Sequence, residues 1–359
     1  MEPVNYGNIQ MKIALLNDTH AGVRNGSDLF LNYSDRFYKN TFFPFLKEAN
    51  ITKIVHLGDY FEHRKYVNFK VLKHNYETFI SKLEEHDITM DIILGNHDVY
   101  YKNTNHLNAL EEILGQYDNI NVITKPTVLS YDSLDMLLLP WMCAENQAES
   151  LKAIQDTKAS VLGGHLELDG FEMMRGVKAT HGMDIKPFDK FDMVLSGHYH
   201  TKSSRKNIHY LGTQFQLNYS DANEQKYFHV LDTETRELTA VENPDTMFHK
   251  LVYDENKKPD ILEKFKNTYV KVIVLNKKNL YEFDKWFDKL QRTEPFEIKV
   301  AESFEEYLGD NVEDESINTA DTPTLLNSYI DSTETDLNKD VLKKLMQELY
   351  VEAQNMTDI

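Results

Sequence analysis

Two histidines, His198 and His200, follow an apolar run and a glycine in the stretch MVLSGHYH (193–200). Imidazole is the commonest protein ligand for metal ions, so this pair indicates a candidate metal site. One such pair is equally typical of an ordinary loop. The interpretation therefore depends on whether other segments of the chain supply further ligands.

Four more segments share this design, in which a short run rich in Ile, Val and Leu ends in a polar or glycine-marked exit. They are KIALLND (12–18), KIVHLGD (53–59), DIILGNHD (91–98) and SVLGGH (160–165). Their exits carry metal-binding side chains, namely Asp18, His20, Asp59, Asn96, His97, Asp98 and His165. Runs of this kind are typical of strands buried on both faces. Because ligands of open α/β sheets bind beyond the carboxyl ends of the strands, we expect these side chains to lie together.

The residue types indicate which ions such a site would hold. Carboxylate, imidazole and amide ligands without thiolate suit manganese, iron or zinc better than copper(I) or an iron–sulfur cluster. The ligands suffice for two ions, and two ions about 3.5–4 Å apart can activate a water and stabilise both oxygens of a phosphate-ester displacement. Asp59 is the expected bridging carboxylate, because Gly58 before it lets the backbone approach closely.

Elements between these runs predict the architecture. The amphipathic stretches 37–50 and 69–87 are expected to be helices, and strand alternating with helix is the pattern of a layered α/β domain. Further strands are expected at 135–141, 207–213 and 226–233. These would supply a second sheet and give an α/β sandwich rather than a single sheet.

The pattern changes beyond residue 240. Strands at 268–275 and 296–302 around a helix over LYEFDKWFDKLQ (280–291) predict a small separate α+β unit. Residues 301–321 hold eight acidic residues and no Lys or Arg, which is typical of a linker. In the tail that follows, Val341, Leu345 and Leu349 recur every four residues and predict an amphipathic helix.

The charge is unevenly distributed. The net charge of −19 argues against a protein that grips DNA by charge alone, but residues 301–359 hold fifteen acidic and three basic residues. The segment 250–300 has twelve basic and nine acidic residues, and is the best candidate to touch a DNA backbone. The single cysteine, Cys143, excludes a disulfide framework and fits a reducing, cytoplasmic setting. We expect no membrane span and no secretory signal.

The motifs DTH, GDYF, GNHD, GGH and GHYH, in this order and spacing, resemble those of the calcineurin-like metallophosphoesterases. The resemblance is closest to their DNA-repair branch, the nuclease subunits of SbcCD-type complexes. LPWMCAEN, YLGT and the tail ending in LYVEAQ are similar to the subunits of this branch found in T-even-type phages. The resemblance covers residues 11–359. It implies a four-layer α/β/β/α sandwich at 11–240, a small α+β capping and DNA-contacting domain at 241–300, an acidic linker at 301–321 and a helical tail at 322–359.

Carried over by position, the resemblance implies a ligand set for each of two divalent ions, with manganese preferred to magnesium. The first set would be Asp18, His20, Asp59 and His200, and the second Asp59, Asn96, His165 and His198. His97 would be a catalytic residue that assists the leaving oxygen, oriented by Asp98, although a turn-capping role for Asp98 is an equal alternative. Glu62 stands where cellular relatives usually have a histidine, and His63 follows one place later, so the exonuclease role of that family histidine is not carried over to Glu62.

The function that the resemblance implies is a metal-dependent DNA exonuclease and endonuclease in recombination, repair and replication. Its expected partner is an SMC-like ABC ATPase bound through the helices of 322–359, with two nuclease subunits in a heterotetramer, in the cytoplasm of a host cell if the chain is phage-encoded. Two alternatives stay open. The motifs alone permit a nucleotide phosphodiesterase or a phosphatase, which would need neither the 241–300 unit nor the tail. A non-catalytic scaffold of the ATPase is disfavoured by the complete ligand set.

Overall fold

The computed structural model describes residues 11–174, 177–180, 182–261, 265–302, 327, 330–331 and 338–356. The chain divides into two compact units. The first comprises Met1–Met174, Lys178–Phe215 and Gln225–Asp245, and the second Arg175–Val177, Gln216–Glu224 and Thr246–Ile359. Of the expected acidic linker, 303–321 lies outside the described residues, as does most of 322–337. The expected domain boundaries therefore stay predictions.

The first sheet has six strands in the order β16-β15-β1-β2-β3-β6. Their bounds are β1 (Lys12–Leu16), β2 (Lys53–His56), β3 (Thr89–Ile93), β6 (Ile120–Ile123), β15 (Lys226–Asp232) and β16 (Leu238–Asn243). The strands β1, β2, β3 and β6 run parallel, and all their Ile, Val and Leu side chains except the half-buried Val122 are buried. The expectation that 226–233 joins a second sheet is wrong, because β15 pairs antiparallel with β1 and closes that edge.

The second sheet also has six strands, in the order β13-β14-β12-β9-β8-β7. Their bounds are β7 (Thr127–Tyr131), β8 (Leu134–Leu139), β9 (Val161–His165), β12 (Met193–Gly197), β13 (Ser203–Arg205) and β14 (Ile208–Tyr210). The strands β8, β9, β12 and β14 pair in parallel. Of the five apolar runs that end in metal-binding residues, three thus belong to the first sheet and two to the second.

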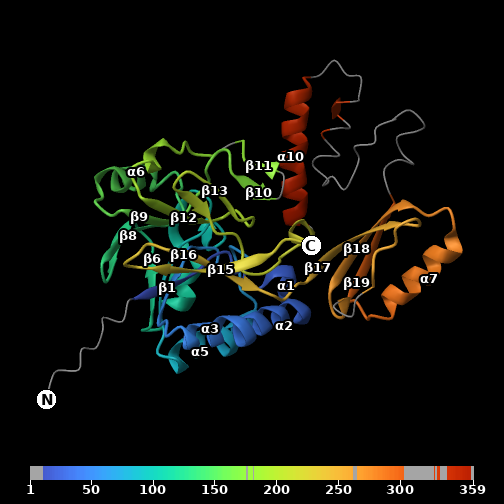
Figure 1. The fold of residues 1–359 in the computed structure, drawn as a ribbon. Coiled ribbons are helices and arrows are strands. Elements are labelled where there is room, and N and C mark those ends of the chain that lie inside the picture. The colour runs from blue at the N-terminus through green and yellow to red at the C-terminus, as the bar shows by residue number, and fades with distance from the viewer. Residues whose placement is uncertain are drawn as a thin grey trace. The chain divides into compact units, whose positions relative to one another are not determined.

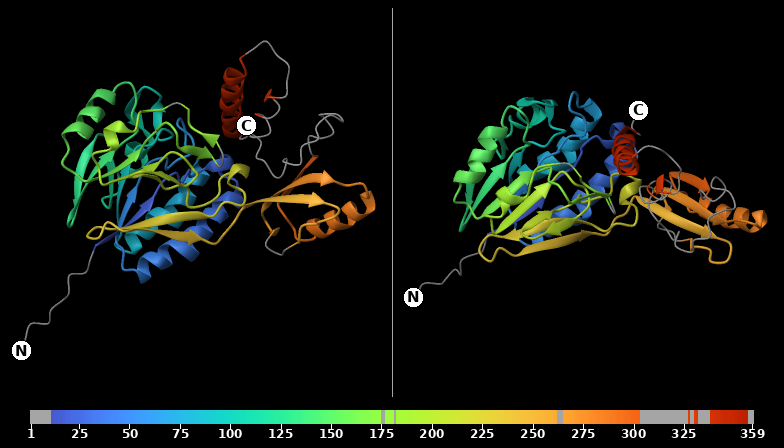
Figure 2. Two further views of the ribbon diagram at one scale, coloured as in Figure 1. Left: turned by 45° about the horizontal axis from the view of Figure 1, so that its top comes forward. Right: turned by 90° about the horizontal axis from the view of Figure 1, so that it is seen from above.

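The two sheets pack face to face, with helices outside both (Figures 1 and 2). Their shared core includes Leu15 and Val55 from one sheet and Leu138 and Leu195 from the other. The outer face of the first sheet is covered by α2 (Asp28–Phe37), η1 (Tyr38–Phe42), α3 (Phe43–Glu48), α4 (Phe69–Asn75), η2 (Tyr76–Ile80) and α5 (Ser81–Glu85). Against the second sheet lies α6 (Gln147–Asp156), through Ile154. The expected four-layer α/β/β/α sandwich is confirmed.

Short elements connect these layers. They are α1 (Val23–Gly26), β4 (Val99–Tyr101), β5 (Thr104–Asn108), η3 (Leu110–Leu114), β10 (Glu172–Met174), β11 (Val177–Lys178) and η4 (Lys186–Phe188). Side-chain caps fix the beginnings of two of the longer helices. The Ser27 side chain accepts from the Phe30 amide before α2, and Asn68 accepts from the Val71 amide before α4.

The second unit contains η5 (Tyr219–Asp221) and a parallel sheet of β17 (Phe248–Asp254), β18 (Tyr269–Asn276) and β19 (Glu297–Glu302). Helix α7 (Leu280–Gln291), which has the bounds of the predicted helix, packs Trp286 and Leu290 against Val270 and Val272 on one face of this sheet. The tail contains α10 (Lys339–Met356). Within the described part of the chain, no helix combines the length and apolarity needed to cross a membrane.

Candidate metal centre

The exits of β1 and β2 run side by side at the edge of the first sheet. The Asp18 amide donates to the Gly58 carbonyl at 2.9 Å, and the His20 amide donates to the Asp59 carbonyl at 3.1 Å. Gly95, after β3, lies so close that an added Cβ would stand 2.1 Å from Asp59 Oδ1 and 2.2 Å from the Asp59 nitrogen. The three exits therefore meet only because glycine occupies position 95.

Four of the predicted ligands have a left-handed backbone. The φ angles of Asp18, His20, Asp59 and His198 are 48°, 44°, 54° and 86°. Such angles are uncommon for residues other than glycine, and they cluster at functional sites where the surrounding structure holds them. Hydrogen bonds between the strand exits hold them here: for example, the His198 amide donates to both carboxylate oxygens of Asp18, at 3.1 and 3.0 Å.

One group of potential ligands consists of Asp18, His20 and His200, whose ligand atoms lie within 4.8 Å of one another. The Nε2 atoms of His20 and His200 face each other at 3.2 Å, and Asp18 Oδ1 is 4.0 Å from both. Burial lowers the pKa of His200 well below its ordinary value, so this imidazole is neutral and has a lone pair for a metal.

A second group consists of Asp59, His165 and His198, again within 4.8 Å. Asn96 Oδ1 lies 3.0 Å from His165 Nε2 and 2.9 Å from His198 Nδ1. His165 Nδ1 is 2.8 Å from the Leu57 carbonyl, which leaves Nε2 directed at the site. Burial lowers the pKa of His198 to about 3, so this ring is also a neutral ligand.

Asp59 lies between the two groups. Its Oδ2 atom is 3.7 Å from His20 Nε2 and 3.3 Å from His165 Nε2. All seven predicted ligands thus converge. All of them except His198 and His200 have less than a tenth of their surface exposed. Buried carboxylate, imidazole and amide groups turned toward a common centre form a donor set that fits two divalent ions.

His97 lies beside this centre with its ring edge-on to His20, at 4.9 Å between ring centroids. Its amide donates to Asp59 Oδ1 at 2.7 Å, and its Nδ1 is 2.6 Å from the Glu62 carbonyl. Asp98 was expected to orient this ring, but among the described residues its carboxylate forms no hydrogen bond with His97. Its carboxylate accepts from the main-chain amides of Asp59, Tyr60, Phe61 and Gly95. The structure therefore supports the turn-binding alternative for Asp98.

Two residues at the centre escaped the sequence-based assignment. The centroid of the Trp141 ring lies 5.3 Å from that of the His198 ring and 6.0 Å from that of the His165 ring. Trp141 thus packs against one side of the second group. Glu62 contacts His20, with 2.7 Å between Oε2 and Nδ1. Its position directly after GDYF was the one available signal, but the sequence alone does not show that its side chain reaches a ligand 42 positions earlier.

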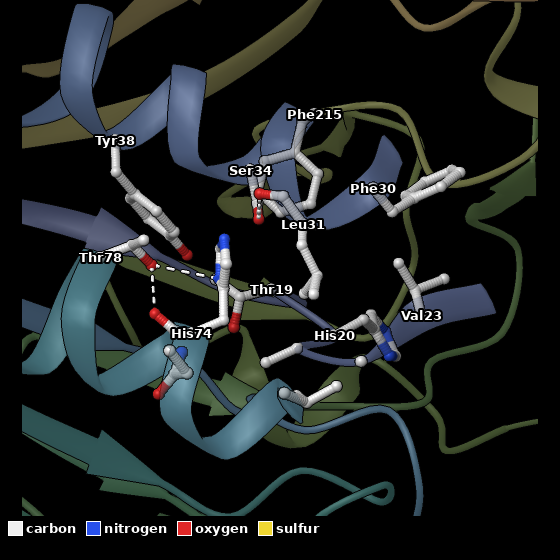
Figure 3. A pocket seen from close by; sticks show the side chains of 14 residues that line it. Thr19, His20, Val23, Phe30, Leu31, Ser34, Tyr38, His74, Thr78 and Phe215 are labelled. Atoms are coloured by element: carbon white, nitrogen blue, oxygen red, sulfur yellow. Dashed lines mark hydrogen bonds between the residues drawn. The ribbon is translucent and has the colours of Figure 1, made fainter. Parts of the chain in front are cut away.

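A cavity lies behind His20, between α2 and α4, and Figure 3 shows His20 at one edge and Tyr38 and Thr78 at the other. Its lining is largely apolar, including Phe30 and Leu31. Of the predicted ligands it contains only His20. The cavity is therefore distinct from the cluster of predicted ligands.

Comparisons with known proteins agree with this geometry. Residues 11–202 match the sequence profile of the calcineurin-like phosphoesterases. The chain is 34% identical over 346 residues to exonuclease subunit 1 of Enterobacteria phage T4, covering 96% of this chain and 99% of that one. It is 30% identical over 151 residues to a subunit of the nuclease SbcCD of Staphylococcus epidermidis, covering 39% of this chain and 37% of that protein.

Solved structures of low identity also match. An archaeal phosphodiesterase has 13% identity and a TM-score of 0.33, covering 65% of this chain and 100% of that one. A purple acid phosphatase from yellow lupin seeds has 14% identity and a TM-score of 0.35, covering 65% of this chain and 46% of that one.

Proposed function

The chain belongs to the calcineurin-like phosphoesterases, enzymes that hydrolyse phosphate esters, and we propose that its substrate is DNA. The observation that carries the proposal is the convergence of the seven predicted ligands, with Asp59 between the two groups and His97 beside them. The similarity to a phage exonuclease subunit over nearly the full length of both chains supports a nuclease rather than a small-molecule phosphatase.

Each residue has a proposed role. One divalent ion would be held by Asp18, His20, Asp59 and His200, and the other by Asp59, Asn96, His165 and His198. When bound, manganese ions would supply a nucleophilic hydroxide and neutralise charge on the phosphate. His97 keeps its Nδ1 against the Glu62 carbonyl, so its Nε2 is the nitrogen that would protonate the leaving oxygen.

The second unit would contact the DNA backbone. Lys250, Lys271 and Lys299 are register partners on three neighbouring strands, so they share one face of the sheet. Strands alternate their side chains, and Val270 and Val272 face α7, so the lysines occupy the opposite face. Like charges directly opposite one another are destabilising, and polyanionic phosphates would offset that repulsion.

The tail would bind an SMC-like ABC ATPase. On α10, Val341, Leu345 and Leu349 are 63%, 48% and 48% exposed, which leaves an apolar stripe open for the groove of a partner. The phage relative is named as a subunit, which supports an assembly of this kind. In such a complex, with two nuclease subunits in the cytoplasm, the chain would act in recombination, repair and replication.

The experiment that tests this function compares the wild type with His97→Ala on linear double-stranded and circular single-stranded DNA with manganese. Loss of a general acid is expected to slow cleavage by about 10²–10⁴-fold, while manganese binding is retained because His97 is not a ligand. Cleavage by His97→Ala at the wild-type rate would contradict the general-acid role of His97. Hydrolysis of a small diester without DNA cleavage, tested with and without the ATPase, would favour the nucleotide phosphodiesterase.

A further inference from the structure

The backbone around Glu62 is fixed to the turn that carries His20. The Ala21 amide donates to the Tyr60 carbonyl at 2.7 Å, and the Glu62 amide donates to the Ala21 carbonyl at 3.1 Å. Ala21 and Phe61 form an isolated parallel bridge. Glu62 is therefore placed against the first ligand turn by main-chain hydrogen bonds, independently of its own side chain.

Glu62 contacts two imidazoles by two different groups. Its carboxylate Oε2 lies 2.7 Å from His20 Nδ1, and its main-chain carbonyl lies 2.6 Å from His97 Nδ1. The side chains of His20 and Glu62 are only 3% and 18% exposed, so their contact is poorly screened by water. Both rings thus turn Nδ1 toward Glu62, which leaves Nε2 on the opposite edge of each ring.

The other ring nitrogen of His20, Nε2, points into the metal centre. His20 Nε2 lies 3.2 Å from His200 Nε2 and 3.7 Å from Asp59 Oδ2, on the opposite edge of the ring from Glu62. A carboxylate behind the distal nitrogen of a metal-binding histidine fixes the ring and makes the proximal nitrogen a better ligand. This is the arrangement that Glu62 and His20 present.

We infer that Glu62 is a positioning residue that sets His20 for one of the two metal sites, while its carbonyl holds His97 independently. The inference rests on the proposed two-metal centre. It gives a role to the position where the sequence resemblance led us to expect a histidine. The carboxylate here acts on a metal ligand. Because His20 belongs only to the first group of ligands, Glu62 does not act through it on the second group around Asn96.

The test uses the full-length protein, freed of metal and titrated with manganese by calorimetry. In Glu62→Ala, one of the two sites is expected to bind manganese about 10–100-fold more weakly, because the ring of His20 loses its support. The other site is expected to keep its affinity. Glu62→Gln, which keeps an oxygen at the same reach without the charge, is expected to fall between Ala and the wild type.

Two further measurements separate positioning from general damage. Because the carbonyl of residue 62 remains in every variant, cleavage by Glu62→Ala is expected to recover when manganese is raised, whereas His97→Ala stays slow at any concentration. Glu111→Ala is the control, since the Glu111 carboxylate likewise contacts a neighbouring side chain, accepting a hydrogen bond from Asn108 at 2.7 Å, but outside the centre. Thermal unfolding of the metal-free proteins reports on folding.

The outcomes are distinct. Unchanged affinity at both sites in Glu62→Ala would overturn the inference, and so would equal weakening of both sites with a lowered unfolding temperature. A wild type that binds fewer than two manganese ions, or that binds two and cleaves no DNA, would contradict the proposed function instead. Selective weakening of one site, with recovery at high manganese, supports the positioning role.

Discussion

At the scale of single residues, the metal centre depends on positions that have no functional group. Gly95 faces Asp59, and a Cβ at residue 95 would meet main-chain and carboxylate atoms rather than the movable end of a side chain. The Asp59 backbone is also tied to Asp98 through its amide, at 2.9 Å. No rotamer change can relieve this clash.

We therefore expect Gly95→Ala to weaken manganese binding at both sites, because Asp59 would serve both ions. The strain is expected to cost about 1–3 kcal/mol of unfolding free energy or more. Gly163→Ala is the control: its Cβ would meet side-chain atoms of Leu138, Leu57 and Met136 at 3.0–3.2 Å, which can shift. Calorimetric titration and denaturant unfolding measure the two effects. A Gly95→Ala protein that binds two ions normally would contradict the argument.

The sequence predicted well which side chains converge, because each follows its own apolar run and parallel strands bring their carboxyl ends to one edge. It did not predict the contacts between runs. The carboxylate of Glu62 meets His20, and that of Asp98 meets amides after β2, and neither pairing is encoded in the spacing of residues. Long-range register determines such contacts, and a single sequence carries little information on it.

At the scale of elements, strand positions were predictable and strand partners were not. β15 has an apolar centre, with Phe228, Val230 and Leu231 buried, as a strand of either sheet could have, and only its antiparallel register with β1 assigns it to the first sheet. The hairpin of β4 and β5 was missed, since Tyr100 to Asn108 is polar and has no apolar run. The helix at 280–291 was predictable to its ends because Asn279 caps it, accepting from the Glu282 amide at 3.3 Å.

The lysine row of the second unit makes a prediction at this scale. We expect Lys271→Gln combined with Lys299→Gln to weaken DNA binding and to reduce the slope of log affinity against log salt by about 0.9 for each phosphate that a lysine no longer neutralises. The unfolding free energy is expected to stay nearly the same, because burial and Lys299 already lower the pKa of Lys271, a sign that its charge is disfavoured there. The Lys299–Glu297 ion pair that is also lost, at 3.8 Å, is exposed and contributes little.

The control for the lysine row removes the same charge elsewhere in the same unit. Lys258 and Lys266 form ion pairs with Glu282 and Glu294, at 2.6 and 2.5 Å. The double Gln variant of these two lysines is expected to leave the salt slope unchanged. Fluorescence anisotropy at several salt concentrations measures both variants, and equal slopes for the two would show that only net charge matters.

The apolar stripe of α10 makes a second prediction. Leu345→Asp is expected to abolish co-elution with a co-expressed SMC-like ABC ATPase subunit in size-exclusion chromatography, since a charge would have to be buried at the interface. Gln347→Asp introduces the same charge two residues further along, on the opposite side of the helix, and should not disturb the complex. Hydrolysis of a small diester should be the same in both variants. Co-elution of the Leu345→Asp protein would count against the docking proposal.

At the scale of the whole molecule, metal binding is expected to stabilise only one of the two units. All the predicted ligands belong to the first unit. A metal at about 100 times its dissociation constant stabilises the native state by about 2.7 kcal/mol per site. In a unit of this size that corresponds to a rise of about 5–10 °C in unfolding temperature per site.

We therefore expect scanning calorimetry to show two transitions, of which manganese raises one and a chelator lowers it again. The transition of the second unit should stay in place, because none of the predicted ligands belongs to it. A titration with calcium, whose oxygen preference suits the imidazole-rich site poorly, serves as the control. Equal shifts of both transitions would show that metal binding acts on the whole chain.

The left-handed backbone at Asp18, His20, Asp59 and His198 has a consequence for protein design. Transplanting the seven side chains onto another α/β scaffold would not reproduce the centre, because ordinary strand exits direct their Cβ atoms elsewhere. The unit that must be moved is the set of turns, together with the neighbouring strands that hold them. The geometry of this metal centre thus depends on the main-chain torsion angles of the ligands as much as on which residues they are.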